Sequence, residues 1–237
     1  MNVNAYVCLR ADVIGSRGTR KAALLPEIAQ ALNARMQTDN LIPFTPRAGD
    51  ELFAVFGSIQ SGYQAFRWLH RQAHAHQLGF YVGFGVGGIE DAISADPERI
   101  NGPAIWRASD ALDELKREPL SEVLKIISKR DFRYNLHGSE DSAVNLALET
   151  YLYFVMQKVE SRTVQQNLAI QLFEEHPDWT NAQLYWQVSG TDEKRVPVAN
   201  ATANFSKLLA RANYHFVREA EESLMALLQS LSEREKT

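Results

Sequence analysis

The sequence has a single cysteine, no long hydrophobic run and no excess of positive charge. One cysteine, Cys8, excludes an intramolecular disulfide and any metal centre built on several thiolates. Because no run of about 18 apolar residues occurs, we expect no membrane-spanning helix, and the N-terminus lacks the pattern of a signal peptide. The formal net charge of -4 argues against a chain that coats nucleic acid, so any DNA contact is expected to be local. We therefore expect a cytoplasmic protein.

Glycine is scarce in the second half of the chain, where Gly190 is the only one after Gly138. Apolar residues there recur at helical spacing, whereas the first half mixes strand-like and helix-like patterns. A chain of 237 residues suits one large domain or two small ones. We therefore predict an α+β domain over residues 1–140, followed by a helical domain over residues 141–237.

Hydrophobic patterns in the first half predict the order strand, helix, strand, strand, helix, strand, with a further helix after it. The strands are expected at residues 5–14, 41–46, 51–56 and 78–90, and the helices at 20–38, 58–77 and 101–116. This order is typical of a ferredoxin-like fold, in which the first and third strands lie inside an antiparallel sheet and both intervening helices cover one face. Residues 121–130 predict another strand, and residues 130–141 a polar turn.

Two carboxylates stand out by position. Asp12 ends the first predicted strand, and Asp50 lies in the predicted hairpin between the next two. Neighbouring strands would bring both to one end of the sheet, and two such oxygen donors are what Mg²⁺ requires. Gly15, Ser16 and Arg17 follow Asp12 and are candidates to bind phosphate at the start of a helix. Alternatively, an aspartate at the end of a strand and a Gly-Asp pair in a hairpin can serve only to form the turns, without binding a ligand.

Four segments carry a resemblance to a known family. They are Ala-Asp-Val-Ile-Gly-Ser-Arg at 11–17, Ala-Gly-Asp-Glu-Leu-Phe at 48–53, Asn-Gly-Pro-Ala-Ile-Trp-Arg-Ala at 101–108, and Phe-Ser-Lys-Leu-Leu-Ala-Arg-Ala-Asn-Tyr at 205–214. These four segments, in their order along the chain, resemble those of the SatD family of bacterial proteins. The resemblance implies a nucleotidyl-cyclase-like first domain and a C-terminal helix-turn-helix.

The first two segments are also similar, more distantly, to the palm of nucleotidyl cyclases and GGDEF proteins. That similarity implies that Asp12 and Asp50 hold metal ions for phosphoryl transfer. The Asn and Arg that stabilise the transition state in class III cyclases correspond here to Trp106 and Asp110. Without that positive group, the sequence favours binding of a nucleotide over its turnover.

The second half predicts helices at residues 143–175, 181–188, 197–212 and 214–231. A short helix, a turn containing glycine and a longer helix are typical of a helix-turn-helix. Residues 194–218 contain five basic residues and no acidic one. The candidates for DNA contact are Asn200, Thr202, Asn204, Lys207 and Arg211. The same helices also suit a module that only packs or dimerises.

The sequence favours a regulator that senses a nucleotide with Mg²⁺ and binds DNA. Two alternative functions stay open. One is a divergent nucleotidyl or phosphoryl transferase in which Arg107 supplies the missing positive charge. The other is a non-catalytic interaction protein that forms a homodimer. His70 and His74 are spaced to hold a metal, but without a neighbouring glutamate the pattern favours a solvated helix face.

Overall fold

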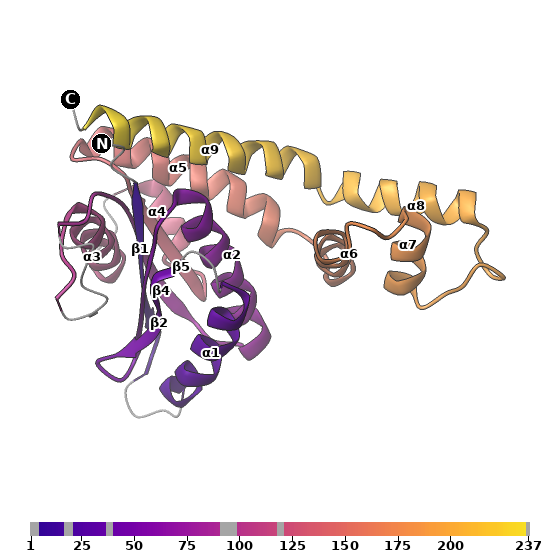
Figure 1. Cartoon of the computed structure of the whole chain (residues 1–237), viewed down its shortest axis with the longest axis horizontal. Coiled ribbons are helices and arrows are strands. Elements are labelled where there is room, and N and C mark those ends of the chain that lie inside the picture. Colours follow the sequence, from indigo (N-terminus) through magenta and orange to yellow (C-terminus); the bar gives the residue numbers. More distant parts are fainter. Residues whose placement is uncertain (1–4, 17–20, 37–39, 91–98, 118–120, 236–237) are drawn as a thin grey trace. The chain divides into compact units, whose positions relative to one another are not determined.

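The computed structural model describes residues 5–16, 21–36, 40–90, 99–117 and 121–235. It is a mixed α+β structure, which confirms the α+β part of the predicted fold class. Contacts divide the chain into two units, one formed by Met1–Leu152 with Leu224–Thr237 and the other by Tyr153–Ser223 (Figure 1). No described helix is long and apolar enough to cross a membrane.

A five-stranded sheet forms the centre of the first unit. Its strands are β1 (Tyr6–Val13), β2 (Asn40–Arg47), β3 (Glu51–Phe56), β4 (Phe80–Gly87) and β5 (Phe132–His137), and their order across the sheet is β2-β3-β1-β4-β5. The first four pair antiparallel, and β5 pairs parallel with β4. The first and third strands thus lie inside the sheet, as the order of elements predicts.

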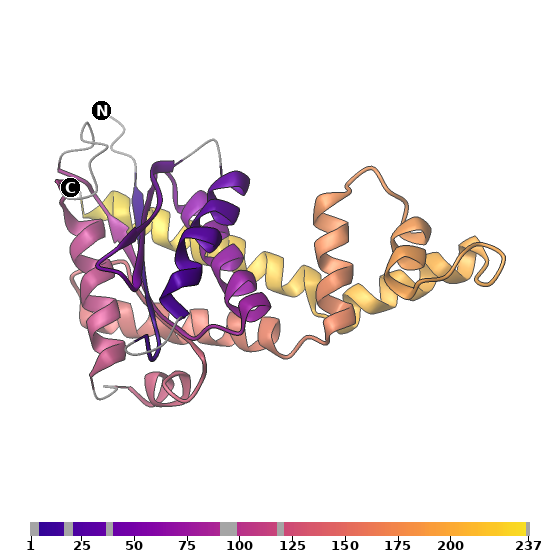
Figure 2. The ribbon, with the colours of Figure 1, turned by 90° about the horizontal axis from the view of Figure 1, so that it is seen from below.

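Helices cover both faces of this sheet. They are α1 (Leu25–Arg35, after the short 3-10 helix η1 at Lys21–Leu24), α2 (Ile59–His76), α3 (Pro103–Lys116) and α4 (Glu122–Ile127). The two views agree that α1 and α2 lie on one face and α3 on the other (Figures 1 and 2). The helices predicted at 20–38 and 58–77 therefore share a face, as expected.

Glycines let α3 approach the sheet closely. A Cβ atom added to Gly85 would lie 2.2 Å from the carbonyl oxygen of Ala104, and one added to Gly83 would lie 2.0 Å from that of Ala108. Cys8, on the neighbouring strand, is fully buried in the same layer, as expected for a small hydrophobic residue. The glycine-rich strand thus brings α3 within reach of the polar residues of β1.

The prediction for residues 121–141 is wrong. The stretch expected as a strand contains α4, whose N-terminus is capped by Ser121, and the stretch expected as a turn contains β5. An apolar run as short as that of α4 fits either a strand or a helix, and the cap decides it. The polar residues Asn135 and His137 favoured a turn over a strand for β5. In the structure both side chains are buried and hydrogen-bonded.

The second unit is helical. It contains α6 (Val164–Glu175), α7 (Asn181–Ser189) and α8 (Val198–Arg211), together with parts of α5 (Ser142–Glu160) and α9 (Tyr214–Arg234). The single helix predicted at 143–175 is in fact two, because Thr163 and Gln166 form a capping box that starts α6. Phe205 and Leu209 of α8 pack with Leu184 of α7 in a common core.

Candidate functional site

Asp12 and Asp50 lie at the same end of neighbouring strands, as predicted. Asp12 is paired in register with Glu51, and the backbone N–H of Val13 donates to the carbonyl oxygen of Asp50 at 3.0 Å. The tight turn from β2 into β3 includes Gly49, which has a φ of 89°. Pairing of β1 with β3 thus fixes the two aspartates next to each other along the sheet edge.

Their side chains, however, engage different partners. The Lys116 ammonium lies 2.5 Å from Asp12 Oδ2, and the Ser16 hydroxyl donates to Asp50 Oδ2 at 2.6 Å. Asp12 Oδ1 is buried and meets no hydrogen-bond donor among the described residues. A metal ion bound to Asp12 would therefore have to displace the Lys116 ammonium from the carboxylate.

The predicted phosphate-binding residues are only partly described. Gly15 is exposed and adopts a φ of 68°, and Ser16 is half-buried beside Asp50, whereas Arg17 lies outside the described residues. Within the described ranges, no three His, Cys, Asp or Glu side chains gather as a metal-ligand set. Mg²⁺ at this edge stays a prediction, and so does phosphate beside it.

A second ion pair lies beside Asp12 on the face covered by α3. Arg10 donates from Nε and Nη2 to the two oxygens of Glu51 at 2.8 and 2.7 Å, and from Nη1 to the Ser109 hydroxyl at 2.6 Å. The hydrogen bond to Glu51 raises the pKa of Arg10. Charged residues at alternate positions of an otherwise apolar strand were the sequence signal for this network. It joins β1, β3 and α3 through side chains that satisfy one another.

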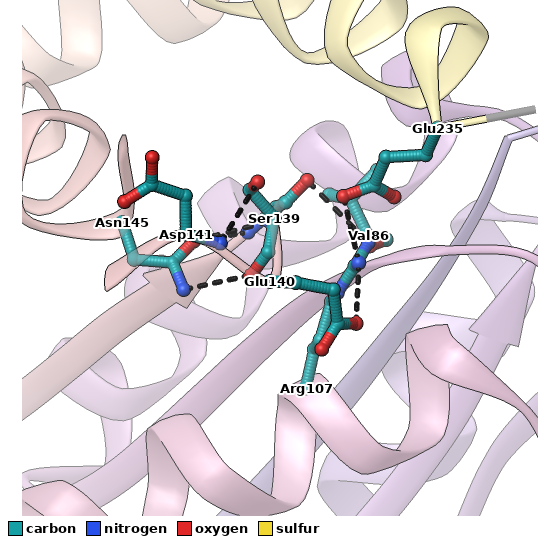
Figure 3. Close-up of polar contacts among 8 residues, drawn as sticks. Val86, Arg107, Ser139, Glu140, Asp141, Asn145 and Glu235 are labelled. Atoms are coloured by element: carbon teal, nitrogen blue, oxygen red, sulfur yellow. Dashed lines mark hydrogen bonds and ion pairs between the residues drawn. The ribbon is translucent and has the colours of Figure 1, made fainter. Parts of the chain in front are cut away.

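Arg107, the candidate cation of a transferase, is held elsewhere (Figure 3). Its side chain is buried and donates from Nη1 to the Val86 carbonyl oxygen at 2.8 Å and from Nη2 to Glu140 and Glu235 at 2.7 and 2.8 Å. The Asn145 side chain accepts from the backbone N–H groups of residues 138 and 139, which orders the loop that meets Arg107. Two carboxylates therefore already neutralise this guanidinium.

A polar cavity of about 440 Å³ opens beside Arg107, between α3 and the segment that follows β5. On its wall, Glu114 Oε2 accepts from Asn135 at 2.8 Å and lies 3.1 Å from His137 Nε2. The hydrogen bond with His137 lowers the pKa of Glu114. The nearby Glu149 has its pKa raised by burial, and Ser121 donates a hydrogen bond to it. These side-chain pairs connect α3, β5, α4 and α5, so their role is structural.

The second unit places the predicted DNA contacts on one helix. Asn200, Thr202, Lys207 and Arg211 are exposed on α8, and Asn204 is half-buried. A cavity of about 310 Å³ brings three of the predicted side chains together, and its lining consists of Gln165, Tyr185, Asn204, Lys207, Leu208 and Arg211. The chain from α7 to α8 is anchored by Trp186, whose Nε1 donates to the Val196 carbonyl oxygen at 2.9 Å.

Comparison with known proteins adds no relative: the chain matches no model of a protein family and no curated protein.

Proposed function

We propose that the chain is a DNA-binding regulatory protein of the SatD type, in which α7 and α8 form a helix-turn-helix and α8 is the recognition helix. The observation that carries this proposal is the outer face of α8. Ala201, Phe205 and Leu209 are buried, whereas the opposite side presents polar and basic side chains to solvent. No acidic residue occurs on α8, so this face offers no charge that repels phosphate.

The N-terminal half of α8 suits base contacts, because asparagine bonds adenine in the major groove and threonine reaches bases or phosphates. Asn200 and Thr202 are exposed there. Pro197 occupies the N-cap position of α8 without a side-chain hydrogen bond, so the first N–H groups of the helix are not satisfied by a cap. Lys194 and Arg195 are exposed just before the helix and supply positive charge at this end.

The C-terminal half of α8 suits phosphate contacts. Lys207 and Arg211 are exposed one turn apart and line the same cavity as Asn204. Arg218 differs from them, since it lies 3.4 Å from Glu221 and 3.5 Å from Glu222 on α9. The positive charge available to DNA is thus concentrated on α8 and the turn before it.

For the first unit we propose a ferredoxin-like, cyclase-related domain that senses a nucleotide at the Asp12 and Asp50 edge. The buried Asp12 Oδ1, which has no donor among the described residues, supports a ligand there. This second function involves binding without turnover, because Arg107 is neutralised by Glu140 and Glu235.

DNA binding is tested by fluorescence anisotropy of the full chain with a mixed-sequence duplex at several salt concentrations. The double variant Lys207→Ala, Arg211→Ala should bind at least tenfold more weakly, and the slope of log K against log salt should fall by about 2, one for each lost phosphate contact. The control variant Lys129→Ala, Lys158→Ala removes the same charge from exposed positions outside α8. Equal losses in both variants, or no binding by the unmodified chain, would reject the proposal.

A further inference from the structure

The proposed function uses the exposed face of α8 but does not account for the cavity beside that helix. This cavity of about 310 Å³, called the α8 cavity below, lies in the second unit and is lined from α6, α7 and α8. Gln165 comes from α6 and Tyr185 from α7. The other lining residues, all on α8, are Asn204, Lys207, Leu208 and Arg211. Five of these six side chains carry polar groups, so the lining suits a polar ligand.

The polar side chains of the α8 cavity do not satisfy one another. Within the part of the chain that the structure describes, no hydrogen bond or ion pair engages the side chains of Gln165, Tyr185, Asn204, Lys207 or Arg211. The cavity beside Arg107 differs, because Arg107 is paired there with Glu140, and Glu114 with His137. The hydrogen-bonding groups of the α8 cavity are thus available to a ligand.

The charge of the lining is positive. Lys207 and Arg211 contribute two charges, and no described aspartate or glutamate lines the cavity. Neither α7 nor α8 contains an acidic residue, and the two of α6, Glu174 and Glu175, lie at the opposite end of that helix from Gln165. Gln165 belongs to the first turn of α6, where the helix dipole adds partial positive charge. The cavity therefore attracts an anion and repels a cation.

The donors and the size of the cavity favour a phosphate ester among anions. Arginine offers a planar fork of N–H groups, lysine three donors, each amide two and tyrosine one. A phosphate ester presents three strongly accepting oxygens and can take hydrogen bonds from several such groups at once. The volume lies near the lower end of the range of about 300–1,000 Å³ for small-molecule sites, which leaves room for a small sugar on the phosphate. The Tyr185 ring and Leu208 offer apolar surface to that sugar.

We propose that the α8 cavity binds a small phosphate monoester. Lys207 and Arg211 would hold the phosphate, and the neutral donors of Gln165, Tyr185 and Asn204 would complete its hydrogen bonds from three helices. The binding itself does not depend on the proposed function, but its consequence does. Because Lys207 and Arg211 are also the proposed phosphate contacts to DNA, the ester and DNA would compete. A small phosphate ester would then release the chain from DNA.

Binding is tested on the full chain with ribose 5-phosphate as the probe, by the broadening of its ³¹P resonance at constant pH and ionic strength. The affinity should fall about tenfold in Lys207→Ala, Arg211→Ala and about threefold in Gln165→Ala, which removes no charge. The control Lys129→Ala, Lys158→Ala should bind as the unmodified chain does. Gln165 is exposed, so its replacement does not disturb the core.

The outcome of this titration is separate from that of the DNA assay. If the unmodified chain does not broaden the ³¹P resonance, or if Lys207→Ala, Arg211→Ala broadens it equally, the ester does not bind in the α8 cavity and the inference is wrong. The anisotropy assay then still decides DNA binding by itself. If the probe binds to the cavity while the chain binds no DNA, the cavity site stands and the proposed function is rejected.

Competition is tested by adding ribose 5-phosphate to the complex with the duplex. The reference sample receives NaCl to the same ionic strength, because salt alone weakens DNA binding. At ten times the Kd of the probe, competition should weaken the apparent affinity of the unmodified chain for the duplex about tenfold. Gln165→Ala should lose less affinity at the same probe concentration. A duplex that stays equally bound while the probe occupies the cavity would show that the ester does not release DNA.

Discussion

The Lys116 ammonium lies 2.5 Å from Asp12 Oδ2, so the last residue of α3 neutralises a carboxylate at the end of β1. The lysine stands where the sequence led us to expect a metal ion. One Asp12 oxygen is thereby occupied, and the other is buried with no donor among the described residues. Lys116 and a metal ion are thus competitors for the same carboxylate.

Removing the lysine should make the sheet edge more receptive to Mg²⁺. In Lys116→Ala, MgCl₂ added with a nucleoside triphosphate should raise the melting temperature more than in the unmodified chain. A ligand at 100 times its Kd stabilises by about 2.7 kcal/mol, which is a shift of a few degrees. Lys125→Ala removes an exposed lysine from a surface pair and should behave as the unmodified chain does. If Mg²⁺ with the nucleotide raises the melting temperature of neither Lys116→Ala nor Lys125→Ala, Asp12 is not a metal ligand.

Glu51→Gln should destabilise the first unit, because it removes the carboxylate that takes two hydrogen bonds from Arg10. Both side chains are largely covered, so we expect the free energy of unfolding to fall by about 2 kcal/mol. Urea denaturation measures it. The comparison is Glu122→Gln, which breaks the solvent-screened surface pair with Lys125 and should change stability much less. Equal effects would mean that the Arg10 pair contributes no more than a surface pair.

Gly85→Ala should disrupt packing between β4 and α3. The new methyl group would lie 2.2 Å from the Ala104 carbonyl oxygen, which is backbone and cannot swing away. We expect a loss of several kcal/mol or no folded protein, as in other overpacked cores. Gly88→Ala is the control, since a Cβ there meets nothing within 4 Å. Thermal unfolding followed by circular dichroism separates the two, and a well-folded Gly85→Ala would contradict the close approach of α3.

The pH dependence of stability should reflect Glu114, whose pKa is lowered chiefly by its hydrogen bond with His137. A carboxyl with a lower pKa in the folded state contributes stability above its unfolded pKa of about 4.3, and that stability is lost as the pH falls through the folded value. Glu114→Gln should therefore lose less stability than the unmodified chain as the pH falls below about 4.5. Urea midpoints between pH 3 and 7 measure this, with the exposed Glu193→Gln as control. An unchanged acid slope would show that the bond to His137 is not formed in solution.

Much of the fold followed from local patterns. The first four strands and the helices between them are where alternation and helical spacing predict them. The failures cluster at residues 121–141 and 161–163, where caps set by Ser121 and Thr163 outweigh the apolar pattern. Sequence spacing says little about such boundaries, because a single side-chain hydrogen bond decides them.

The candidate site was less accessible to sequence reasoning. That Asp12 and Asp50 share one end of the sheet followed from strand order, but Lys116 beside Asp12 did not, because the two are far apart in the chain. The sequence predicts a solvated helix face for His70 because no glutamate neighbours the His70 and His74 pair, whereas the packing of Phe132 shows that His70 is buried. Long-range side-chain partners such as these depend on tertiary packing, which local periodicity does not encode.

The contact between Arg107 and Glu235 has a consequence for how the chain is made. The first unit includes a segment from late in the chain, in which Glu235 binds Arg107 and Leu228 lies against Gly138. The ribosome delivers Tyr153–Ser223 as one uninterrupted stretch before that segment is synthesised. Because domains form as their residues emerge, the helical unit is free to fold before Glu235 reaches Arg107.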